Sequence, residues 1–326
     1  MKRYLIIQTA FLGDVVLATS MIESIHATAP DIKISMLVRD GNQHLLKDHP
    51  YLEHVIVWKK NSGKIKSLLH VINEIRKIRF DAVINLQRFF SSGLITAVSG
   101  SPVRSGFSKN PLSFLFSHKT VHVIGDGRHE TERNISLLKG IIDVSCLKPK
   151  LYPSEKDKTK TSAFKDQPYV TMAPASVWFT KQLPVQKWIE LCGRVPDHIK
   201  VYLIGAPSDK QLCDKILSGS GRNNILNLAG EFSILQTASL MENAQMNFVN
   251  DSGPLHLASA MNAPVTAFFC STVPAFGFGP LSEKSSIIET KQPLTCRPCG
   301  LHGKKECPEK HFRCGTEIDL TDIRFN

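Results

Sequence analysis

Short apolar runs alternate with helical spacing of apolar residues along most of the chain. In the first half, runs typical of β-strands occupy residues 4–9, 33–38, 54–58, 82–85 and 121–123. Between them, apolar residues recur at helical spacing around residues 15–27, 65–77 and 131–142. Strands that alternate with helices predict a mainly parallel sheet with helices on both faces.

A polar stretch at residues 149–167 interrupts this pattern, and we expect it to be a linker. The alternation then resumes, with strands predicted at 169–173, 200–204, 225–227, 246–249 and 265–269 and helices at 185–194, 210–217 and 233–243. The sequence therefore predicts two α/β domains, residues 1–155 and 156–326. Open sheets of this type bind ligands at the carboxyl ends of their strands, so we expect a cleft between the domains.

The composition is that of a globular protein, because 42% of the 326 residues are hydrophobic and 21% are charged. No apolar run reaches the roughly 18 to 20 residues that cross a bilayer. The first seven residues resemble the start of a signal peptide, but polar Gln8 interrupts the run. This favours a first core strand and a cytoplasmic protein.

Forty Lys and Arg residues against twenty-nine Asp and Glu residues give a formal net charge of +11, which favours an anionic partner. Stacking aromatic residues are not interleaved with the basic ones, so nucleic acid is disfavoured. The densest basic stretch, residues 59–79, also has apolar residues at near-helical spacing. It predicts a helix with a buried apolar face and a solvated basic face, or alternatively a helix that contacts an anionic membrane surface.

The most informative motif is Asn250-Asp251-Ser252-Gly253-Pro254-Leu255-His256, between a predicted strand and a predicted helix. Pro254 suits the first helical turn, where its missing N–H costs nothing. Gly253 allows a ligand close to the backbone, and unpaired amides at a helix start favour an anion. Asp251 and His256 add polar groups at the same place. The motif therefore indicates a phosphate-binding site, although an ordinary loop with a capping Asp or Ser has the same local spacing.

Candidate side chains also follow three other predicted strands. Asp14, in the first loop, is a candidate general base or a helix cap, and the absence of G-x-G-x-x-G there disfavours a dinucleotide oxidoreductase. Ser176 and Lys181 share a loop in the second domain and are candidates to clamp a phosphate, with simple exposure of the lysine as the alternative. Asp209 follows a further strand, where an acid holds ribose hydroxyls or caps a helix.

Taken in order, these segments resemble glycosyltransferase family 9, the heptosyltransferases. In the second domain the resemblance lies in residues 175–181, 205–209, 228–230, 250–258 and 276–280. In the first domain it lies in Phe11-Leu12-Gly13-Asp14-Val15-Val16 and in Asn85-Leu86-Gln87. The resemblance spans nearly the whole chain, which makes it far more specific than any single loop.

The resemblance implies a GT-B fold, in which two Rossmann-like, doubly wound domains face each other across a cleft. The second domain would bind a nucleotide-sugar, ADP-heptose in the characterised members. The first domain would bind the inner core of a lipopolysaccharide precursor. The reaction would be an inverting transfer that requires neither a metal nor another cofactor.

The resemblance also implies a role for each matching residue. Asp14 would deprotonate the acceptor hydroxyl, and Lys181 would stabilise the departing diphosphate. The residues that would bind the donor with Lys181 are Ser176, Asp209, Asp251, Ser252, Gly253 and His256.

The residues expected on the acceptor side are less specific. Gly13, Arg88, Arg104 and the motif His129-Glu130-x-x-Arg133 lie near predicted strand ends. They are candidates to meet the carboxylates or phosphates of an anionic glycolipid, and the alternative for each charged residue is a surface salt bridge. An acceptor of this kind would also bring the protein into peripheral contact with the inner membrane.

Four of the eight cysteines fall near the end of the chain, as Cys296-x2-Cys299-x7-Cys307-x6-Cys314. Family members often carry a similar cluster. Four thiols favour a small structural zinc site over disulfides, with His302 and His311 as substitute ligands and free or reversibly paired thiols as the alternative. The other four are expected to be buried small hydrophobic residues, namely Cys146, Cys192, Cys213 and Cys270.

Two other functions share most of these residues. One is a GT-B enzyme that uses another nucleotide-sugar and a different glycan or protein acceptor. The other is a non-catalytic protein that binds a sugar nucleotide, which would keep Lys181 and Asp251 but have no need of Asp14.

Overall fold

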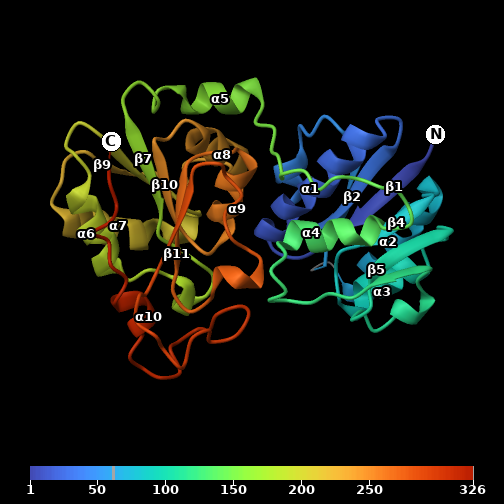
Figure 1. Cartoon of the computed structure of the whole chain (residues 1–326). Helices are drawn as coiled ribbons and strands as arrows, with labels where there is room; N and C mark the ends of the chain where they lie inside the picture. The colour runs from blue at the N-terminus through green and yellow to red at the C-terminus, as the bar shows by residue number, and fades with distance from the viewer. Residues whose placement is uncertain (61–62, 326) are drawn as a thin grey trace. The chain divides into compact units, whose positions relative to one another are not determined.

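The computed structural model describes residues 1–60 and 63–325. The chain divides into two compact units, Met1–Tyr152 and Pro153–Asn326 (Figure 1). Each unit is built on a six-stranded sheet in which every strand pair is parallel. Within the described residues, none of the helices combines the length and the apolar character that a membrane span requires.

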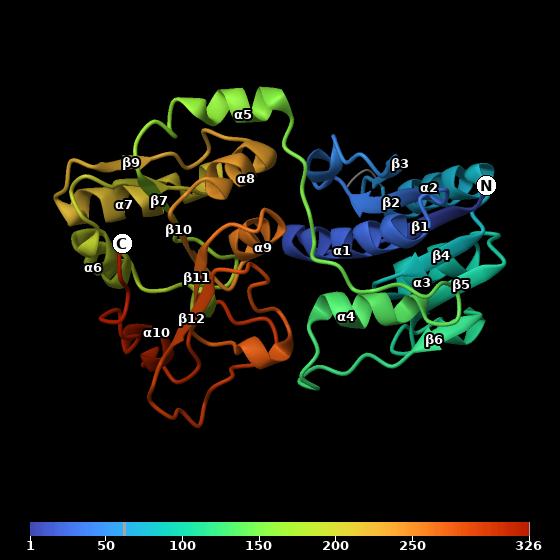
Figure 2. The ribbon, with the colours of Figure 1, turned by 45° about the horizontal axis from the view of Figure 1, so that its top comes forward.

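The first sheet has the strand order β3-β2-β1-β4-β5-β6. Its strands are β1 (Arg3–Ile7), β2 (Lys33–Arg39), β3 (Leu52–Trp58), β4 (Ala82–Asn85), β5 (Val103–Phe107) and β6 (His118–Thr120). The α-helices of this unit are α1 (Leu12–Thr28), α2 (Lys64–Ile78), α3 (Phe90–Ala97) and α4 (Glu130–Ile135). Short 3-10 turns are η1 (Gln43–Leu46), η2 (Ser113–Leu115) and η3 (Ser136–Leu138). Helix α1 packs with α4 and α2 packs with α3, one pair on each face of the sheet (Figure 2).

The second sheet repeats this order as β9-β8-β7-β10-β11-β12. Its strands are β7 (Tyr169–Ala173), β8 (Lys200–Leu203), β9 (Ile225–Asn227), β10 (Met246–Asn250), β11 (Val265–Phe269) and β12 (Ser285–Glu289). Its α-helices are α5 (Glu155–Ser162), α6 (Val185–Arg194), α7 (Lys210–Ser220), α8 (Ile234–Glu242), α9 (Gly253–Ala260) and α10 (Arg313–Thr316). Short 3-10 turns are η4 (Phe179–Lys181), η5 (Pro207–Asp209) and η6 (Pro274–Phe276). Helix α6 packs with α7, and α8 packs with both α5 and α9 (Figure 2).

The central strands are apolar because helices cover both faces of each sheet. Every residue of β4, β7 and β11 is buried. In the second unit, the rings of Trp188 on α6 and Phe268 on β11 meet edge to face, with their centroids 5.3 Å apart. Burial of such side chains supplies most of the free energy that stabilises each unit.

Both sheets have the strand order 3-2-1-4-5-6 of the classic dinucleotide-binding fold. The order reverses between β1 and β4 in the first unit and between β7 and β10 in the second. Loops that leave the two strands of such a pair diverge to opposite faces, which opens a crevice at the carboxyl edge of the sheet. Each unit therefore has one position that suits a ligand.

Three predictions from the sequence pattern are wrong in detail. Residues 121–123 form no strand, and Val121 is 63% exposed; β5 and β6 complete the sheet instead. The helix predicted at 131–142 ends at Ile135 and continues only as η3. The predicted linker contains helix α5. Ser154 is the N-cap residue of this helix, and its side chain accepts a hydrogen bond from the Asp157 amide. This helix was missed because its sequence has no apolar periodicity.

The basic stretch at residues 59–79 forms α2, but only part of its apolar set is buried. Val71, Ile72 and Ile75 pack into the core of the first unit. Ile65 is 77% exposed and Leu69 is 55% exposed, one helical turn apart near the start of α2. The helix therefore presents two apolar side chains to solvent beside its basic face.

Candidate active site

Two oppositely charged side chains meet at the carboxyl edge of the second sheet. Lys181 follows β7 and Asp251 follows β10, the two strands between which the strand order reverses. Lys181 Nζ lies 2.7 Å from Asp251 Oδ2, and the two side chains are only 15% and 7% exposed. The sequence names both residues as candidates, and the fold brings them into direct contact.

A third residue, Thr272, completes this pair. It follows β11, the neighbour of β10, and its hydroxyl donates a 2.6 Å hydrogen bond to Asp251 Oδ2. The same carboxylate oxygen thus receives an ammonium and a hydroxyl donor. A charge-assisted arrangement of this kind holds a buried carboxylate in one orientation.

Asn250 fixes the loop that carries Lys181. Its side chain is fully buried; Oδ1 accepts a 2.9 Å hydrogen bond from the Leu183 amide, and Nδ2 donates to the Pro174 carbonyl oxygen at 2.8 Å. One amide side chain therefore ties both ends of the loop to β10. Asn250 was part of the sequence motif without a role, and only the structure reveals its partners.

The amino terminus of α9 lies next to Asp251 in the chain. Ser252 is the N-cap residue, and no side chain caps the helix. Gly253 and Pro254 occupy the first two helical positions, as the motif predicts. The first amides of the helix, with the helix dipole behind them, favour an anion. His256 is buried in the next turn, with its ring centroid 6.5 Å from that of Phe278.

Ser176 and Asp209 occupy the loops expected for them. Ser176 is half-buried in the loop before Lys181, and its carbonyl oxygen accepts a hydrogen bond from Gln182 Nε2. Asp209 Oδ2 accepts a 2.8 Å hydrogen bond from the Ala206 amide, and Oδ1 accepts one from the Ser208 hydroxyl. The Asp209 carboxylate thus closes the turn η5 and makes no capping hydrogen bond to α7, whereas its ribose contact stays a prediction.

In the first unit, Asp14 lies at the corresponding position after β1. It occupies the first turn of α1, whose N-cap is Phe11, so Asp14 does not cap the helix itself. Gly13 precedes it in the same turn. Asp14 therefore lies in the chain shortly after β1, beside the crevice expected at the strand reversal, and the dipole of α1 favours its negative charge.

Two glutamines line this crevice. Gln87, after β4, donates a short hydrogen bond from Nε2 to Gln8 Oε1, after β1. The Gln8 oxygen also accepts from the Ala10 amide at 3.3 Å, and Asn85 Oδ1 accepts from the Gln87 amide at 2.9 Å. The segments that follow β1 and β4 are thereby joined to each other.

The two arginines predicted on the acceptor side lie at opposite edges of the first sheet. Arg88 is half-buried and directly follows Gln87, at the carboxyl edge that carries Asp14. Arg104 is the second residue of β5, at the amino edge, and its guanidinium donates to the carbonyl oxygens of Leu115 at 3.1 Å and Ser101 at 2.6 Å. Arg104 is therefore remote from Asp14 and serves to hold loops.

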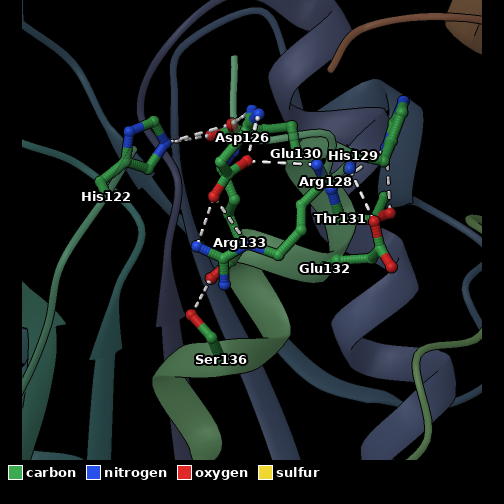
Figure 3. Close-up of polar contacts among 9 residues, drawn as sticks. All are labelled: His122, Asp126, Arg128, His129, Glu130, Thr131, Glu132, Arg133 and Ser136. Atoms are coloured by element: carbon green, nitrogen blue, oxygen red, sulfur yellow. Dashed lines mark hydrogen bonds and ion pairs between the residues drawn. The ribbon is translucent and has the colours of Figure 1, made fainter. Parts of the chain in front are cut away.

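The motif around His129 and Arg133 forms a structural network rather than an exposed basic site (Figure 3). The Arg133 side chain is 1% exposed and pairs with Glu130 Oε2 at 3.1 Å and Asp126 Oδ1 at 3.2 Å. His122 Nε2 lies 3.1 Å from both oxygens of Glu130. Because its guanidinium is buried among carboxylates, Arg133 is not a candidate for acceptor binding.

The same network shifts the pKa of two carboxyls. Hydrogen bonds from Arg128 lower the pKa of Asp126 to about 2, with a smaller contribution from Arg133. Burial alone would raise the pKa of Glu130, but hydrogen bonds and charges from His122 and Arg133 outweigh it, so the pKa is lowered. Both carboxylates are therefore ionised at neutral pH and stabilise the loop against α4.

The four tail cysteines do not form a metal site in the described part of the chain, where no three His, Cys, Asp or Glu side chains are placed to hold an ion. Cys296 Sγ lies 3.8 Å from His311 Nε2, and the Cys307 sulfur accepts from the Phe312 amide at 3.4 Å. Burial raises the pKa of the Cys314 thiol to about 12. The structural zinc site therefore stays a prediction from the sequence.

The remaining cysteines follow the prediction with one exception. Cys192, Cys213 and Cys270 are buried in the second unit, and Cys146 is exposed. Burial raises the pKa of Cys192 and Cys213 to about 12. The three buried thiols therefore behave as small apolar groups.

A protein-family model described as glycosyltransferase family 9 (heptosyltransferase) matches residues 68–312, well over half of the chain. The chain belongs to glycosyltransferase family 9. Its resemblance to that family in the order of loop motifs is thereby confirmed, and the protein is a glycosyltransferase.

This family 9 glycosyltransferase has relatives of similar length. It is 26% identical over 305 residues to lipopolysaccharide heptosyltransferase 2 of Escherichia coli (strain K12), which covers 88% of the chain and 87% of the relative. It is 24% identical over 312 residues to lipopolysaccharide heptosyltransferase 1 of Campylobacter coli, covering 89% and 90%.

Solved structures show the fold of this glycosyltransferase. The E. coli ADP-heptose lps heptosyltransferase II aligns with a TM-score of 0.77 at 24% identity, over 92% of the chain and 96% of that structure. A family 9 glycosyltransferase from Veillonella parvula DSM 2008 aligns with a TM-score of 0.79 at 21% identity, over 88% and 85%. The predicted GT-B fold is therefore confirmed.

Replacing Arg133 by Met should destabilise the first unit of this glycosyltransferase and reduce its sensitivity to acid. Removing one partner of a buried ion pair costs about 3–5 kcal/mol, because Glu130 stays buried without its guanidinium. The pKa values of Asp126 and Glu130 are lowered in the folded state, so their stabilisation is full above about pH 4.5 and is lost as the pH falls toward 2. Thermal unfolding at pH 7 and pH 3 measures both effects.

The expected loss of stability in Arg133→Met is larger at pH 7 than at pH 3. Arg128→Met is the comparison at pH 7, because Arg128 also pairs with Asp126 but its side chain is 42% exposed, so its loss should cost much less stability. An Arg133→Met variant that unfolds at the wild-type temperature at both pH values would contradict the structural role.

Proposed function

We propose that this enzyme transfers a heptose from ADP-heptose to the inner core of a lipopolysaccharide precursor. The observation that carries the proposal is the buried Lys181–Asp251 pair beside the amino terminus of α9, at the strand reversal of the second sheet. The relatives named as lipopolysaccharide heptosyltransferases support the same substrate class.

The donor diphosphate suits the start of α9. A doubly charged anion is favoured there by the amides of Ser252 and Gly253, by the helix dipole and by the Lys181 ammonium. Ser176 offers a hydroxyl from the neighbouring loop. Structures of E. coli heptosyltransferase WaaC with ADP and with ADP-2-deoxy-2-fluoro heptose give a precedent for the ligand class in that protein. A bound diphosphate would give Lys181 a second anionic partner.

Asp251 and His256 suit the sugar side of the same site. Once Lys181 is shared with the diphosphate, the Asp251 carboxylate can accept hydrogen bonds from sugar hydroxyls while Thr272 keeps it oriented. His256, one turn into α9, can add a further polar contact to the donor. We place the nucleotide-sugar in the second unit on these grounds.

The reaction we propose is an inverting displacement. The acceptor hydroxyl oxygen attacks the anomeric carbon of the heptose, its proton passes to the Asp14 carboxylate, and the bond from that carbon to the diphosphate oxygen breaks. The leaving ADP takes the electron pair, and Lys181 with the α9 amides stabilises its charge. Since these groups supply the electrostatic stabilisation that a divalent cation would otherwise give, the step needs no metal.

An anionic acceptor suits the first unit. Arg88 lies at the same edge of the sheet as Asp14, and the chain has a net charge of +11. The phosphates of an inner-core glycolipid would find a favourable potential there. We therefore propose that Arg88 and the turn with Gly13 contact the acceptor.

Peripheral contact with an anionic bilayer follows from such an acceptor. The exposed Ile65 and Leu69 on α2, with the neighbouring exposed Lys66, form an apolar pair flanked by positive charge. This combination favours shallow insertion into the headgroup region of anionic lipid. We propose that α2 is the part of the first unit that contacts the membrane.

Replacing Lys181 by Met should weaken ADP binding and reduce kcat/KM for heptose transfer on the order of 10²–10³-fold, as expected for the loss of one cation at a developing charge. Isothermal titration with ADP and an assay of ADP release from ADP-heptose with a lipopolysaccharide-precursor acceptor measure the two effects. Lys187→Met, which removes an exposed ion pair with Glu190, is the control. Unchanged ADP affinity in Lys181→Met would contradict the donor assignment.

Replacing Asp14 by Asn should leave ADP binding unchanged and slow transfer by about 10²–10⁴-fold, because the neutral amide cannot accept the hydroxyl proton. The exposed Asp31→Asn variant in the same unit is the matched control. Wild-type transfer rates in Asp14→Asn would refute its role as general base. Release of nucleotide from other nucleotide-sugars but not from ADP-heptose would refute the donor identity.

Replacing both Ile65 and Leu69 by Ser should lower binding to phosphatidylglycerol vesicles by roughly tenfold or more, because two apolar side chains no longer enter the interface. Co-sedimentation with phosphatidylglycerol vesicles, and with phosphatidylcholine vesicles for comparison, measures the change. Leu226→Ser, which replaces another exposed leucine on β9, should bind as the wild type does. Equal binding by the double variant and the wild type would rule out α2 as the contact.

A further inference from the structure

The arginine of the cysteine-rich tail is buried beneath the carboxyl edge of the second sheet. Arg297 follows Cys296 in the chain, and its side chain is only 11% exposed. Its Nε donates to the carbonyl oxygen of Cys270 at 2.7 Å. Its Nη2 donates to those of Phe269 at 3.2 Å and Thr272 at 2.7 Å.

Arg297 thereby gathers three backbone acceptors from residues 269–272 around one guanidinium. Buried carbonyl oxygens need donors, and the segment after β11 obtains them from this side chain. Arg297 Nη2 also lies 2.7 Å from Glu289 Oε2, at the end of β12. A planar guanidinium with several fixed donors can serve acceptors from two strand ends at once, which a lysine ammonium cannot do with the same geometry.

The bond to Thr272 leads directly into the nucleotide site. The Thr272 carbonyl oxygen accepts from Arg297, while its hydroxyl donates to Asp251 Oδ2, the oxygen that pairs with Lys181. The orientation of the Asp251 carboxylate therefore depends on a backbone segment that Arg297 holds. One residue, Thr272, lies between Arg297 and Asp251 in this series of hydrogen bonds.

A second stretch of the tail braces Lys181 from its other side. Gly303 has φ +76, and a Cβ there would lie 2.8 Å from Lys181 Cγ, so the backbone packs against the lysine stem. The Lys304 amide donates to Thr180 Oγ1 at 2.8 Å, and the Thr180 amide donates to the Lys304 carbonyl oxygen at 3.1 Å. The segment 297–304 thus reaches both residues of the ion pair. Arg297 is linked to Asp251 through Thr272, and Gly303 packs directly against Lys181.

We propose that Arg297 is a positioning residue for the nucleotide-sugar site and that the tail segment 297–304 is part of the frame of that site. This inference rests on the proposed donor site at Lys181 and Asp251. Arg297 contacts no substrate; it holds the loop of Thr272 and so fixes the direction in which Asp251 presents its carboxylate. Loss of the guanidinium removes a donor from three buried carbonyl oxygens, and the loop moves to find others.

The first test compares ADP affinity among variants of the full chain. Arg297→Gln should weaken ADP binding and lower kcat/KM for transfer on the order of 10–100-fold, the effect of small displacements in a site. Arg297→Lys should fall between Gln and wild type, because it keeps the charge and loses the fork of donors. Isothermal titration is done well below the unfolding temperature, with circular dichroism to confirm folding.

The matched control is Arg313→Gln in the same tail. Arg313 is 48% exposed and pairs only with Glu317 among the described ion pairs, so its loss should leave ADP affinity unchanged. Thr272→Val provides a second route, since it removes the hydroxyl donor to Asp251 and leaves Arg297 in place. It should reproduce the loss of ADP affinity. Wild-type ADP affinity in folded Arg297→Gln, with only a lower unfolding temperature, would overturn the positioning role.

A second measurement needs no ligand and so separates this inference from the proposed function. Unfolding temperatures of Arg297→Lys, Asp251→Asn and the double variant report whether the two residues are coupled. If the double variant lowers the unfolding temperature by less than the sum of the two single shifts, the link through Thr272 is supported. If the two shifts add, the link is overturned. If the wild type binds no ADP, the proposed function fails, and this cycle still decides whether Arg297 holds Asp251.

Discussion

The buried ion pair between Lys181 and Asp251 is the constraint on which the second unit depends. Two charges taken out of water are tolerated only with close pairing and further hydrogen bonds. The 2.7 Å contact and the Thr272 hydroxyl meet that requirement. Asn250 holds the Lys181 loop, and Gly303 leaves room for the lysine stem. Much of the surrounding loop structure therefore serves to keep one cation and one anion together beside the start of α9.

The two units share one strand order and differ in what they place at its reversal. In the first unit, Gln8 and Gln87 close across the reversal, and Asp14 contributes a single carboxylate. In the second, a helix start is combined with a lysine, and this combination attracts anions. We propose that the same backbone topology serves as the position of a proton acceptor in one unit and of a diphosphate in the other. This asymmetry suits a reaction between a hydroxyl acceptor and a charged donor.

The sequence predicts most of the central strands because they are buried on both faces and read as apolar runs. Residues 82–85 and 169–173 coincide with β4 and β7. The misses follow from the same rule. Strand β5, Val-Arg-Ser-Gly-Phe, has no apolar run, whereas the apolar residues of 121–123, Val121 and Val123, are exposed. Helix α5 is polar throughout and is recognisable only from its capping serine.

The candidate site is predicted in part for a physical reason. Asp14, Lys181 and Asp251 lie in segments that follow strands in the chain, so local spacing reveals them. Their partners come from distant segments: Arg297 reaches the backbone of Thr272 across 25 residues, and Thr272 reaches Asp251 across 21. No local pattern encodes such contacts. Arg104 is a further example, since the carbonyl oxygens of Leu115 and Ser101 that its guanidinium meets cannot be read from the local sequence.

The most direct test of the central claim is a crystal structure of the enzyme with bound ADP. The account predicts that the diphosphate lies at the start of α9, with its oxygens within hydrogen-bonding distance of Lys181 Nζ and of the Ser252 and Gly253 amides. ADP bound elsewhere, with Lys181 and Asp251 still paired and out of contact with the nucleotide, would contradict it.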